Sequence, residues 1–168
     1  MTQHATLEPD MLRETASALQ MERDAIYLYD GLARIEKDPV RSEAFRTIAA
    51  DERRHAGVWE GRLREAGCEI PLPKPPRVRM RFILAVARVL GTKAVADLVR
   101  TLEGDDERRY AKGVPTAATG ALGTTMAAMA ADERRHADTL QRLLKPATAM
   151  AAAVESGADR EGRAAASL

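Results

Sequence analysis

The sequence predicts an all-α fold, and three observations support that class. Ala, Leu, Arg and Glu, which favour helices, dominate the composition. Apolar residues recur in alternating steps of three and four along four long segments, and no segment alternates as a half-buried strand would. The octapeptide AADERRHA occurs at residues 49–56 and again at 130–137. This repeat indicates two duplicated helical hairpins, and we therefore expect a four-helix bundle.

The first predicted hairpin covers residues 10–67 and contains two helices. Asp10 is a suitable N-cap for the first of them. Asp38 followed by Pro39 is typical of an N-cap and first helical residue, and it starts the second helix. Gly67 is a suitable C-terminal stop, because glycine tolerates the left-handed conformation that ends many helices.

The connection between the hairpins, residues 68–91, is a long crossover with two parts. CEIPLPKPP, at residues 68–76, is too rich in proline for a helix and is predicted to be extended. Residues 77–90 are basic and apolar, and we expect a short helix that covers the bundle. A helix lying on an anionic membrane and a self-association face are the alternatives for this segment.

The second hairpin is predicted at residues 92–146, with helices at about 92–112 and 119–144 and with Pro146 as the stop. The two hairpins and the crossover then form one domain at residues 10–146. The remaining residues are expected to be tails, at 1–9 and 147–168.

Charge and cysteine content exclude several classes of protein. The chain has 26 basic and 25 acidic residues, so its charge gives no reason to expect a nucleic-acid partner. Cys68 is the sole cysteine, which excludes an internal disulfide and a metal site built from cysteines alone. The N-terminus lacks the pattern of a signal peptide, and the apolar run at residues 80–90 is too short to span a bilayer. We expect a soluble, cytoplasmic chain, with association with a membrane as the alternative.

A comparison of residues 81 positions apart extends the repeat beyond the octapeptide. Each Glu-x-x-His has a further glutamate 30 residues upstream, and a tyrosine follows that glutamate by seven residues. The matched pairs are Glu22 and Glu103, Tyr29 and Tyr110, Glu52 and Glu133, and His55 and His136. The first helix therefore corresponds to the third, and the second to the fourth.

The glutamates and histidines of the repeat lie where core residues belong. Glu22 fills a gap in the apolar stripe of the first helix, and Glu52 and His55 fill gaps in that of the second. The same holds for their copies in the second hairpin. The other charged residues of the octapeptides fall off the stripes, and we expect them to face water: Asp51, Arg53, Arg54, Asp132, Arg134 and Arg135.

Buried carboxylates near one another are costly unless cations compensate them. Two divalent metal ions would balance four glutamates, and two histidines would complete the set as neutral ligands. We therefore predict a di-metal site with the ligands Glu22, Glu52, His55, Glu103, Glu133 and His136. Oxygen-rich ligation with one nitrogen per metal suits iron or manganese and can admit zinc. The alternative is a duplicated bundle with buried salt bridges.

Further candidate residues lie near these ligands along the chain. Tyr29 and Tyr110 are predicted to hydrogen bond to ligand carboxylates, with an electron relay or simple core packing as alternatives. Asp106 and Glu107 fit solvated acids better than they fit an extra metal ligand. Trp59 and the methionines of the fourth helix, Met126 and Met129, are expected in the core.

Four segments resemble the ligand helices of the ferritin-like, rubrerythrin-type di-iron carboxylate family, over residues 10–146. They are LQMERDAIYLYDGLA, FRTIAADERRHAGVWEGRLREAG, VRTLEGDDERRYAKG and MAAMAADERRHADTLQRLL. The DERRHA helices and the connection RVRMRFILAVARVLG are similar, more narrowly, to the ferritin-like domain that precedes a vacuolar-iron-transporter-type membrane domain, also called membrane-bound ferritin. The cysteine-rich rubredoxin-type domain of a complete rubrerythrin has no counterpart here.

The resemblance implies that the six predicted ligands bind two iron ions, with Glu52 and Glu133 bridging both. It implies that Fe²⁺ reacts with O₂ or peroxide at a catalytic set formed by Glu22, Glu52, Glu103 and Glu133. Ferroxidase-type oxidation, in iron homeostasis or oxidative-stress defence, is the leading hypothesis. Peroxide reduction, dimanganese catalase chemistry and a non-enzymatic iron-sensing or iron-delivery module are the alternatives. The protein partners that the hypothesis allows are a membrane iron-transporter domain and a second copy in a homodimer.

Overall fold

The computed structural model describes residues 8–99, 101–102, 105, 108 and 121–144. Within these ranges every regular element is a helix and no strand occurs, which confirms the all-α class. The elements are α1 (Pro9–Ile35), α2 (Pro39–Glu65), α3 (Val78–Leu90), the 3-10 helix η1 (Thr92–Val95) and α5 (Ala121–Leu144). The complete four-helix bundle stays a prediction, because much of its third long helix falls outside the described residues.

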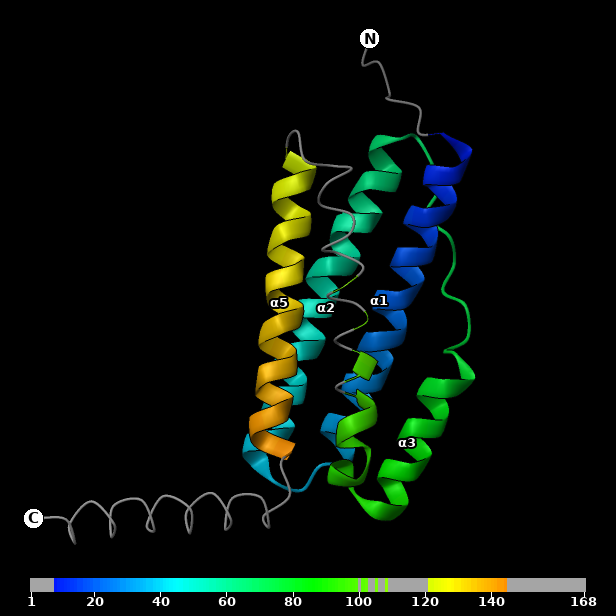
Figure 1. Ribbon diagram of the computed structural model, residues 1–168. Coiled ribbons are helices and arrows are strands. Elements are labelled where there is room, and N and C mark those ends of the chain that lie inside the picture. Colours follow the sequence, from blue (N-terminus) through cyan, green and yellow to red (C-terminus); the bar gives the residue numbers. More distant parts are fainter. Residues whose placement is uncertain (1–7, 100, 103–104, 106–107, 109–120, 145–168) are drawn as a thin grey trace, which may run out of the picture.

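The long helices α1 and α2 lie side by side and run in opposite directions (Figure 1). As predicted, Asp38 caps α2, because its side chain accepts a hydrogen bond from the backbone N–H of Arg41 at 2.9 Å. At the other end Gly67 adopts a φ of 71°, and the backbone N–H of Cys68 donates to the carbonyl oxygen of Leu63 at 2.9 Å. Both ends of α2 are therefore fixed by local sequence.

The start of α1 differs from the expectation. Asp10 lies inside the first turn, where it pairs with Arg13, and Glu8 takes the cap position without a capping hydrogen bond from its side chain. Pro9 explains the shift, because its fixed φ suits the first helical position and its missing N–H needs no partner there.

The connection from α2 to α3 is extended over residues 68–77 and is attached to α1. Gln20 holds it at both polar atoms of its amide, donating to the carbonyl oxygen of Lys74 and accepting from the Lys74 backbone N–H. Arg23 donates to the carbonyl oxygen of Pro71 at 2.8 Å. Where α3 then packs on α1, Gly31 leaves the necessary space, since a Cβ there would lie 2.5 Å from Leu84.

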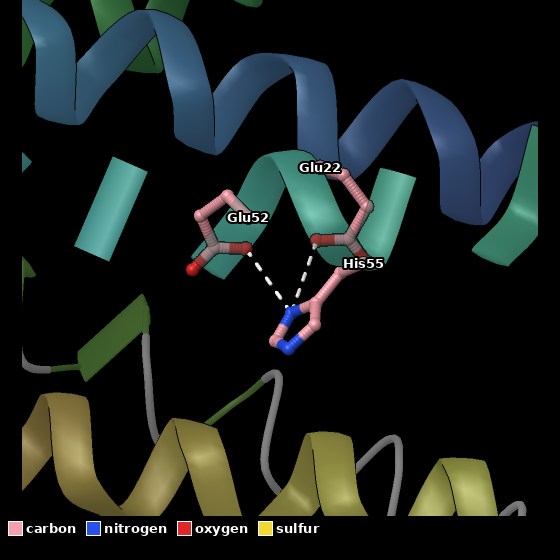
Figure 2. Close-up of side chains that lie close together, drawn as sticks. All are labelled: Glu22, Glu52 and His55. Atoms are coloured by element: carbon pink, nitrogen blue, oxygen red, sulfur yellow. Dashed lines mark ion pairs between the residues drawn. The ribbon is translucent and has the colours of Figure 1, made fainter. Parts of the chain in front are cut away.

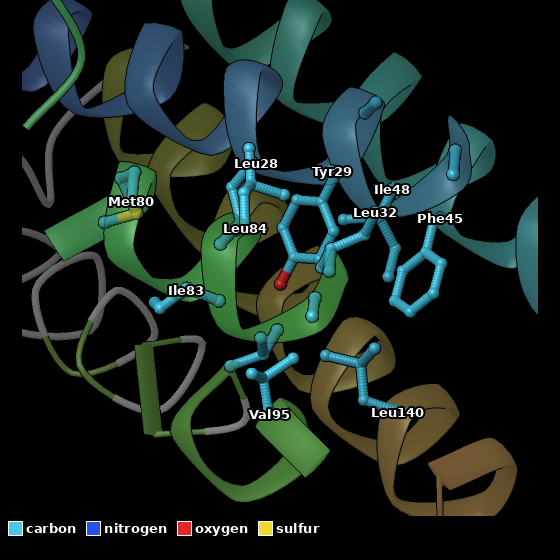
Figure 3. Close-up of a cluster of buried hydrophobic side chains, with 14 of the residues drawn as sticks. Leu28, Tyr29, Leu32, Phe45, Ile48, Met80, Ile83, Leu84, Val95 and Leu140 are labelled. Atoms are coloured by element: carbon cyan, nitrogen blue, oxygen red, sulfur yellow. The ribbon is translucent and has the colours of Figure 1, made fainter. Parts of the chain in front are cut away.

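Hydrophobic side chains form two clusters, one toward each end of the long helices. The larger cluster joins α1, α2, α3 and α5 and includes Leu32, Phe45 and Ile83 (Figure 3). The smaller cluster joins α1, α2 and α5 around Leu19, Trp59 and Met129, so the predicted core positions of Trp59 and Met129 are confirmed. The long helices carry a layer of buried polar side chains between these two clusters.

The length and polarity of each helix decide whether it could cross a membrane. A spanning helix needs about 20 consecutive apolar residues. α3, the most apolar of the helices, has 13 residues. None of the helices in the described part of the chain is long and apolar enough to cross a membrane.

Candidate metal centre

Five of the six predicted ligands lie together in the polar layer between the two hydrophobic clusters. Glu22 comes from α1, Glu52 and His55 from α2, and Glu133 and His136 from α5. Each of the five is at most 4% exposed. The structure therefore buries these helix faces as their spacing predicts, while the role of the side chains as metal ligands stays a prediction.

The Nδ1 atom of His55 faces three carboxylates, two of which are drawn with it in Figure 2. This atom lies 3.5 Å from Glu52 Oε2, 4.0 Å from Glu22 Oε2 and 3.3 Å from Glu133 Oε1. His55 and Glu52 are three residues apart on α2, which places them on one helix face. With Glu22 from α1 they form a group in which one ligand atom from each residue lies within 4.8 Å of the others.

His136 occupies the equivalent place on α5. Its Nδ1 atom lies 3.4 Å from Glu52 Oε1 and 3.4 Å from Glu133 Oε2. Glu52 and Glu133 therefore each turn one oxygen toward His55 and the other toward His136. Glu52, Glu133 and His136 form a second group with ligand atoms within 4.8 Å, so Glu52 belongs to both groups.

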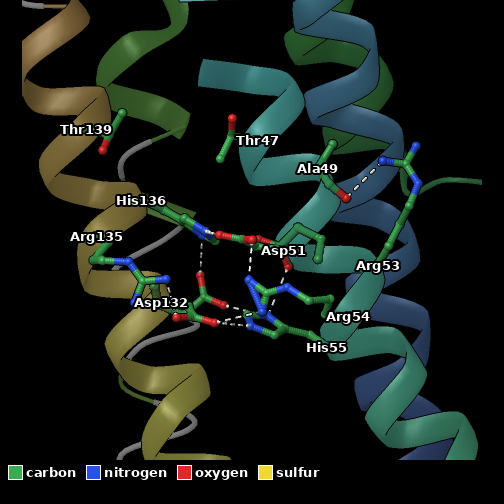
Figure 4. A network of polar contacts seen from close by, with 12 residues as sticks. Thr47, Ala49, Asp51, Arg53, Arg54, His55, Asp132, Arg135, His136 and Thr139 are labelled. Atoms are coloured by element: carbon green, nitrogen blue, oxygen red, sulfur yellow. Dashed lines mark hydrogen bonds and ion pairs between the residues drawn. The ribbon is translucent and has the colours of Figure 1, made fainter. Parts of the chain in front are cut away.

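The second ring nitrogen of each histidine faces an aspartate from the opposite copy of the octapeptide (Figure 4). His55 Nε2 lies 3.1 Å from Asp132 Oδ2, and His136 Nε2 lies 3.0 Å from Asp51 Oδ2. The expectation that these aspartates face water is wrong, because their side chains are 12% and 15% exposed. They lie off the apolar stripe of their own helix but point across the boundary between α2 and α5. A carboxylate at Nε2 favours a proton on that nitrogen, which leaves Nδ1 to act as a ligand.

Arginines of the octapeptides lie over these aspartates on the solvent side. Arg54 forms an ion pair with Asp51, and its Nη1 atom lies 3.5 Å from Oδ2 of Asp132. The Nη2 atom of Arg135 lies 2.5 Å from Oδ1 of Asp132. The arginine side chains are 59% and 61% exposed, as predicted. Burial raises the pKa of Asp132, but His55 and Arg135 outweigh burial and hold that pKa below its ordinary value. Asp132 is therefore ionised and able to orient His55.

Trp59 makes a contact that the sequence analysis did not predict. Its indole N–H donates a hydrogen bond to Glu22 Oε1 at 3.1 Å and so fixes the position of that carboxylate. Trp59 was expected as a core residue only. The signal that could have identified it is its position four residues after His55 on the same face of α2, because a buried indole N–H needs an acceptor.

Tyr29 lies in the larger hydrophobic cluster, where it is 1% exposed and stacks on Phe45 with ring centroids 6.2 Å apart. Its predicted hydrogen bond to a ligand carboxylate stays a prediction. The other predicted residues of the third helix lie outside the described residues: Glu103, Asp106, Glu107 and Tyr110.

Burial and neighbouring charges set the protonation of the carboxylate–histidine groups. Burial, followed by the charges of Glu52 and Glu133, raises the pKa of Glu22 well above its ordinary value. Burial acts in the same direction on Glu52, but hydrogen bonds with His136 and His55 outweigh it and lower the pKa of Glu52. Burial would lower the pKa of His55, yet hydrogen bonds to Glu133 and Glu52 raise it to about 10. Because these pKa shifts favour the protonated forms of Glu22 and His55, divalent cations would compete with protons for both side chains.

The fold and this layer define a helical protein with two adjacent carboxylate–histidine groups that could bind metal. No protein-family model matches the chain, and no solved structure matches it. Over 109 residues, 65% of its length, the chain is 28% identical to a magnesium-protoporphyrin IX monomethyl ester (oxidative) cyclase from Prochlorococcus marinus (strain MIT 9211). The chain spans 31% of the length of that cyclase. The chain therefore resembles one part of a larger oxidative enzyme.

Proposed function

We propose that the chain is a di-iron carboxylate protein that binds two Fe²⁺ ions and oxidises them with O₂ or peroxide. The sharing of Glu52 and Glu133 between two histidines supports this proposal most strongly. Each of these glutamates faces both His55 and His136 at nitrogen–oxygen distances of 3.3 to 3.5 Å. Carboxylates in such a position can bridge two cations. Glu22 completes the group around His55.

The chemistry of the donor set fits two divalent cations. Glu22, Glu52 and Glu133 bring three negative charges when ionised, and Glu103 is the proposed fourth. Four carboxylates would balance two doubly charged ions, which removes the cost of burying them. Each group supplies one imidazole nitrogen among oxygens, which suits iron or manganese. Zinc also fits the ligand set, but it has no redox chemistry.

The proposal includes a complete ferritin-like bundle over residues 10–146. α1, α2 and α5 supply three of its long helices, and the 81-residue repeat supports a fourth that carries Glu103. The crossover at residues 68–91 would then connect two hairpins that place their ligands at the same depth. Such a bundle surrounds the site with helices on all sides.

The surrounding side chains have roles that follow from their contacts. Asp132 and Asp51 hold the imidazoles so that Nδ1 faces the glutamates, and Trp59 orients Glu22. Bound iron would supply the electrons for reduction of the oxidant. Because its pKa is raised, Glu22 would have to release a proton before its carboxylate could bind a metal ion. The hydrophobic clusters on both sides exclude bulk water from the layer.

Aerobic addition of Fe²⁺ tests the proposal. We expect about two irons per chain and a rise in ferric absorbance. Glu52→Gln together with Glu133→Gln removes both shared carboxylates and is expected to abolish binding and the absorbance rise. Glu14→Gln together with Glu43→Gln removes the same charge from exposed positions of α1 and α2, so it serves as the matched control. Equal rates in the two double variants would contradict the proposal.

The likeness to an oxidative cyclase favours an oxidation reaction over the alternative of an iron-sensing or iron-delivery module. A delivery module would bind iron once and stop, whereas an oxidase turns over when Fe²⁺ is added repeatedly in air. Peroxide-dependent reoxidation that is much faster than aerobic reoxidation would indicate a peroxide reductase. O₂ evolution from peroxide by the manganese-loaded chain would indicate catalase chemistry.

A further inference from the structure

α3 has two apolar faces, of which one is buried and the other is exposed. The buried face packs against α1 and η1 (Figures 1 and 3) and consists of Met80, Ile83, Leu84 and Ala87. On the other face Val78, Phe82 and Val89 are 78%, 61% and 81% exposed. A helix that buries one face against its own domain has no structural need for a second apolar face.

The exposed apolar residues of α3 form a continuous line, which we name the α3 ridge: Val78, Phe82, Ala85 and Val89. Steps of four, three and four residues place them along one side of a helix with 3.6 residues per turn. By the same geometry Arg81 and Arg88 lie along one flank of the ridge, and Arg79 lies along the other. All three arginines are exposed.

The charge of this part of the chain is strongly one-sided. Residues 70–96 contain six of the 26 basic residues and none of the 25 acidic residues, which leaves the rest of the chain with 20 cations and 25 anions. Arg77 forms an ion pair with Asp24, in which Nε of Arg77 lies 3.1 Å from Oδ2 of Asp24. Arg79 lines a cavity of about 250 Å³ together with Asp24 and Asp105. Among the described residues, Arg81 and Arg88 have no acidic partner. The flank of the α3 ridge that they form therefore presents uncompensated positive charge.

We propose that the α3 ridge docks on an anionic lipid surface. An apolar ridge bordered by arginines suits a helix that lies in the plane of a bilayer, because the ridge enters the acyl boundary and the arginines reach the phosphates. The net negative charge of the rest of the chain orients the molecule with α3 toward such a surface. This face lies outside the carboxylate–histidine layer, so docking does not depend on the proposed iron chemistry.

A second copy of the chain fits the same ridge less well. The spacing of the ridge would allow two α3 helices to pair through their apolar residues. Such a pair would bring the arginine flanks of both copies together, and residues 70–96 contain no acid to pair with them. Lipid phosphates supply the missing negative charge, whereas a second copy adds positive charge.

Co-sedimentation with lipid vesicles tests the proposal on the full chain. We expect binding to vesicles of phosphatidylcholine mixed with phosphatidylglycerol, loss of that binding at high salt, and little binding to pure phosphatidylcholine. Arg81→Gln together with Arg88→Gln should weaken binding roughly 30-fold, since each basic residue near an anionic surface contributes about a factor of five. Phe82→Ser together with Val89→Ser should weaken it about tenfold or more.

Matched controls separate docking from general effects of substitution. Val40→Ser removes an apolar side chain that is 65% exposed on α2, and Arg46→Gln with Arg64→Gln removes two cations that are 59% and 60% exposed on α2. These controls should bind vesicles as the unaltered chain does. Vesicle binding that is absent, or that is equal in the α3 variants and the controls, would overturn the proposal. Self-association that Phe82→Ser with Val89→Ser abolishes, without vesicle binding, would also overturn it and assign the ridge to a second copy.

Discussion

The two copies of AADERRHA are identical in sequence, but their surroundings in the fold differ. Both supply a glutamate, a histidine that faces it, and an aspartate for the histidine of the other copy. Glu22, the glutamate upstream of the first copy, accepts a hydrogen bond from Trp59. The residue 81 positions after Trp59 is Leu140, which has no side-chain donor.

This difference shows that the repeat and its neighbours contribute separate properties. The repeated residues set which atoms face the centre of the layer. Residues outside the repeat set the local electrostatics, because the hydrogen bond from Trp59 lowers the pKa of Glu22 and opposes the effect of burial. We therefore expect two metal sites of similar geometry but unequal affinity.

Loss of either histidine should have the largest effect on metal binding. His55→Ala and His136→Ala each remove the nitrogen ligand of one group. Removing a residue that only hydrogen bonds to a ligand typically lowers metal affinity 10- to 100-fold, so the loss from removing the ligand itself should be larger. We expect each variant to bind about one Fe²⁺ in place of about two when titrated without oxygen. Binding of two equivalents by either variant, with unchanged affinity, would show that its histidine is not a ligand.

Loss of Asp51 or Asp132, the aspartates that face the histidine of the other copy, should have the next largest effect on metal binding. Asp132→Asn should weaken the site beside His55, and Asp51→Asn the site beside His136, each by about 10- to 100-fold. If Asp132 acts through His55, then Asp132→Asn should have little additional effect in a His55→Ala background. Additive losses in that double-mutant cycle would show that Asp132 acts independently of His55.

Trp59→Phe should have a smaller effect, confined to one site. The variant keeps an aromatic ring in the smaller hydrophobic cluster but removes the hydrogen bond to Glu22. The pKa of Glu22 should rise further, so protons should compete better with metal, and affinity beside His55 should fall about tenfold. Calorimetric titration resolves the two sites, and an equal loss at both would argue against this account.

Glu36→Gln should leave metal binding unchanged, because Glu36 lies outside both copies. Its carboxylate accepts hydrogen bonds from Arg41, Thr92 and the backbone N–H of Asp38. The hydrogen bonds from Arg41, above all, lower the pKa of Glu36 to about 2. A carboxylate whose pKa is lowered by folding stabilises the fold above its ordinary pKa, and this contribution is lost as the pH falls toward 2.

Urea unfolding measures this contribution directly. At neutral pH we expect Glu36→Gln to lower the free energy of unfolding by about 2 kcal/mol, a conservative figure for a pKa shift of this size. The difference from the unaltered chain should shrink as the pH falls below about 4. A difference that is constant down to about pH 2 would show that the charge of Glu36 is not its source.

The sequence predicted much of the fold because several signals are local. Asp38, Pro39 and Gly67 act through their own backbone and nearest neighbours, so the ends of α2 could be located from the chain alone. The burial of Glu52 and His55 could be predicted because both interrupt a regular apolar stripe.

The contacts that the sequence did not predict depend on how helices pair. Asp51 and Asp132 lie just beside the apolar stripes of their helices. Whether such a position faces water or another helix depends on how α2 packs against α5, which the sequence of one helix does not show. The hydrogen bond from Trp59 to Glu22 likewise depends on the alignment of α1 with α2. At the start of α1, proline geometry outweighed the capping preference of Asp10.

The crossed pairs of aspartate and histidine also determine how far α2 can slide along α5. The two helices run in opposite directions (Figure 1). The hydrogen bonds that Asp51 accepts from His136 and that Asp132 accepts from His55 form together at one axial offset. A shift of one turn, about 5.4 Å, would break both bonds and leave buried charges unpaired. Apolar contacts between Ala, Leu and Met side chains discriminate less strongly between such offsets. The polar layer therefore sets the register of the helices, as a buried asparagine does in a coiled coil.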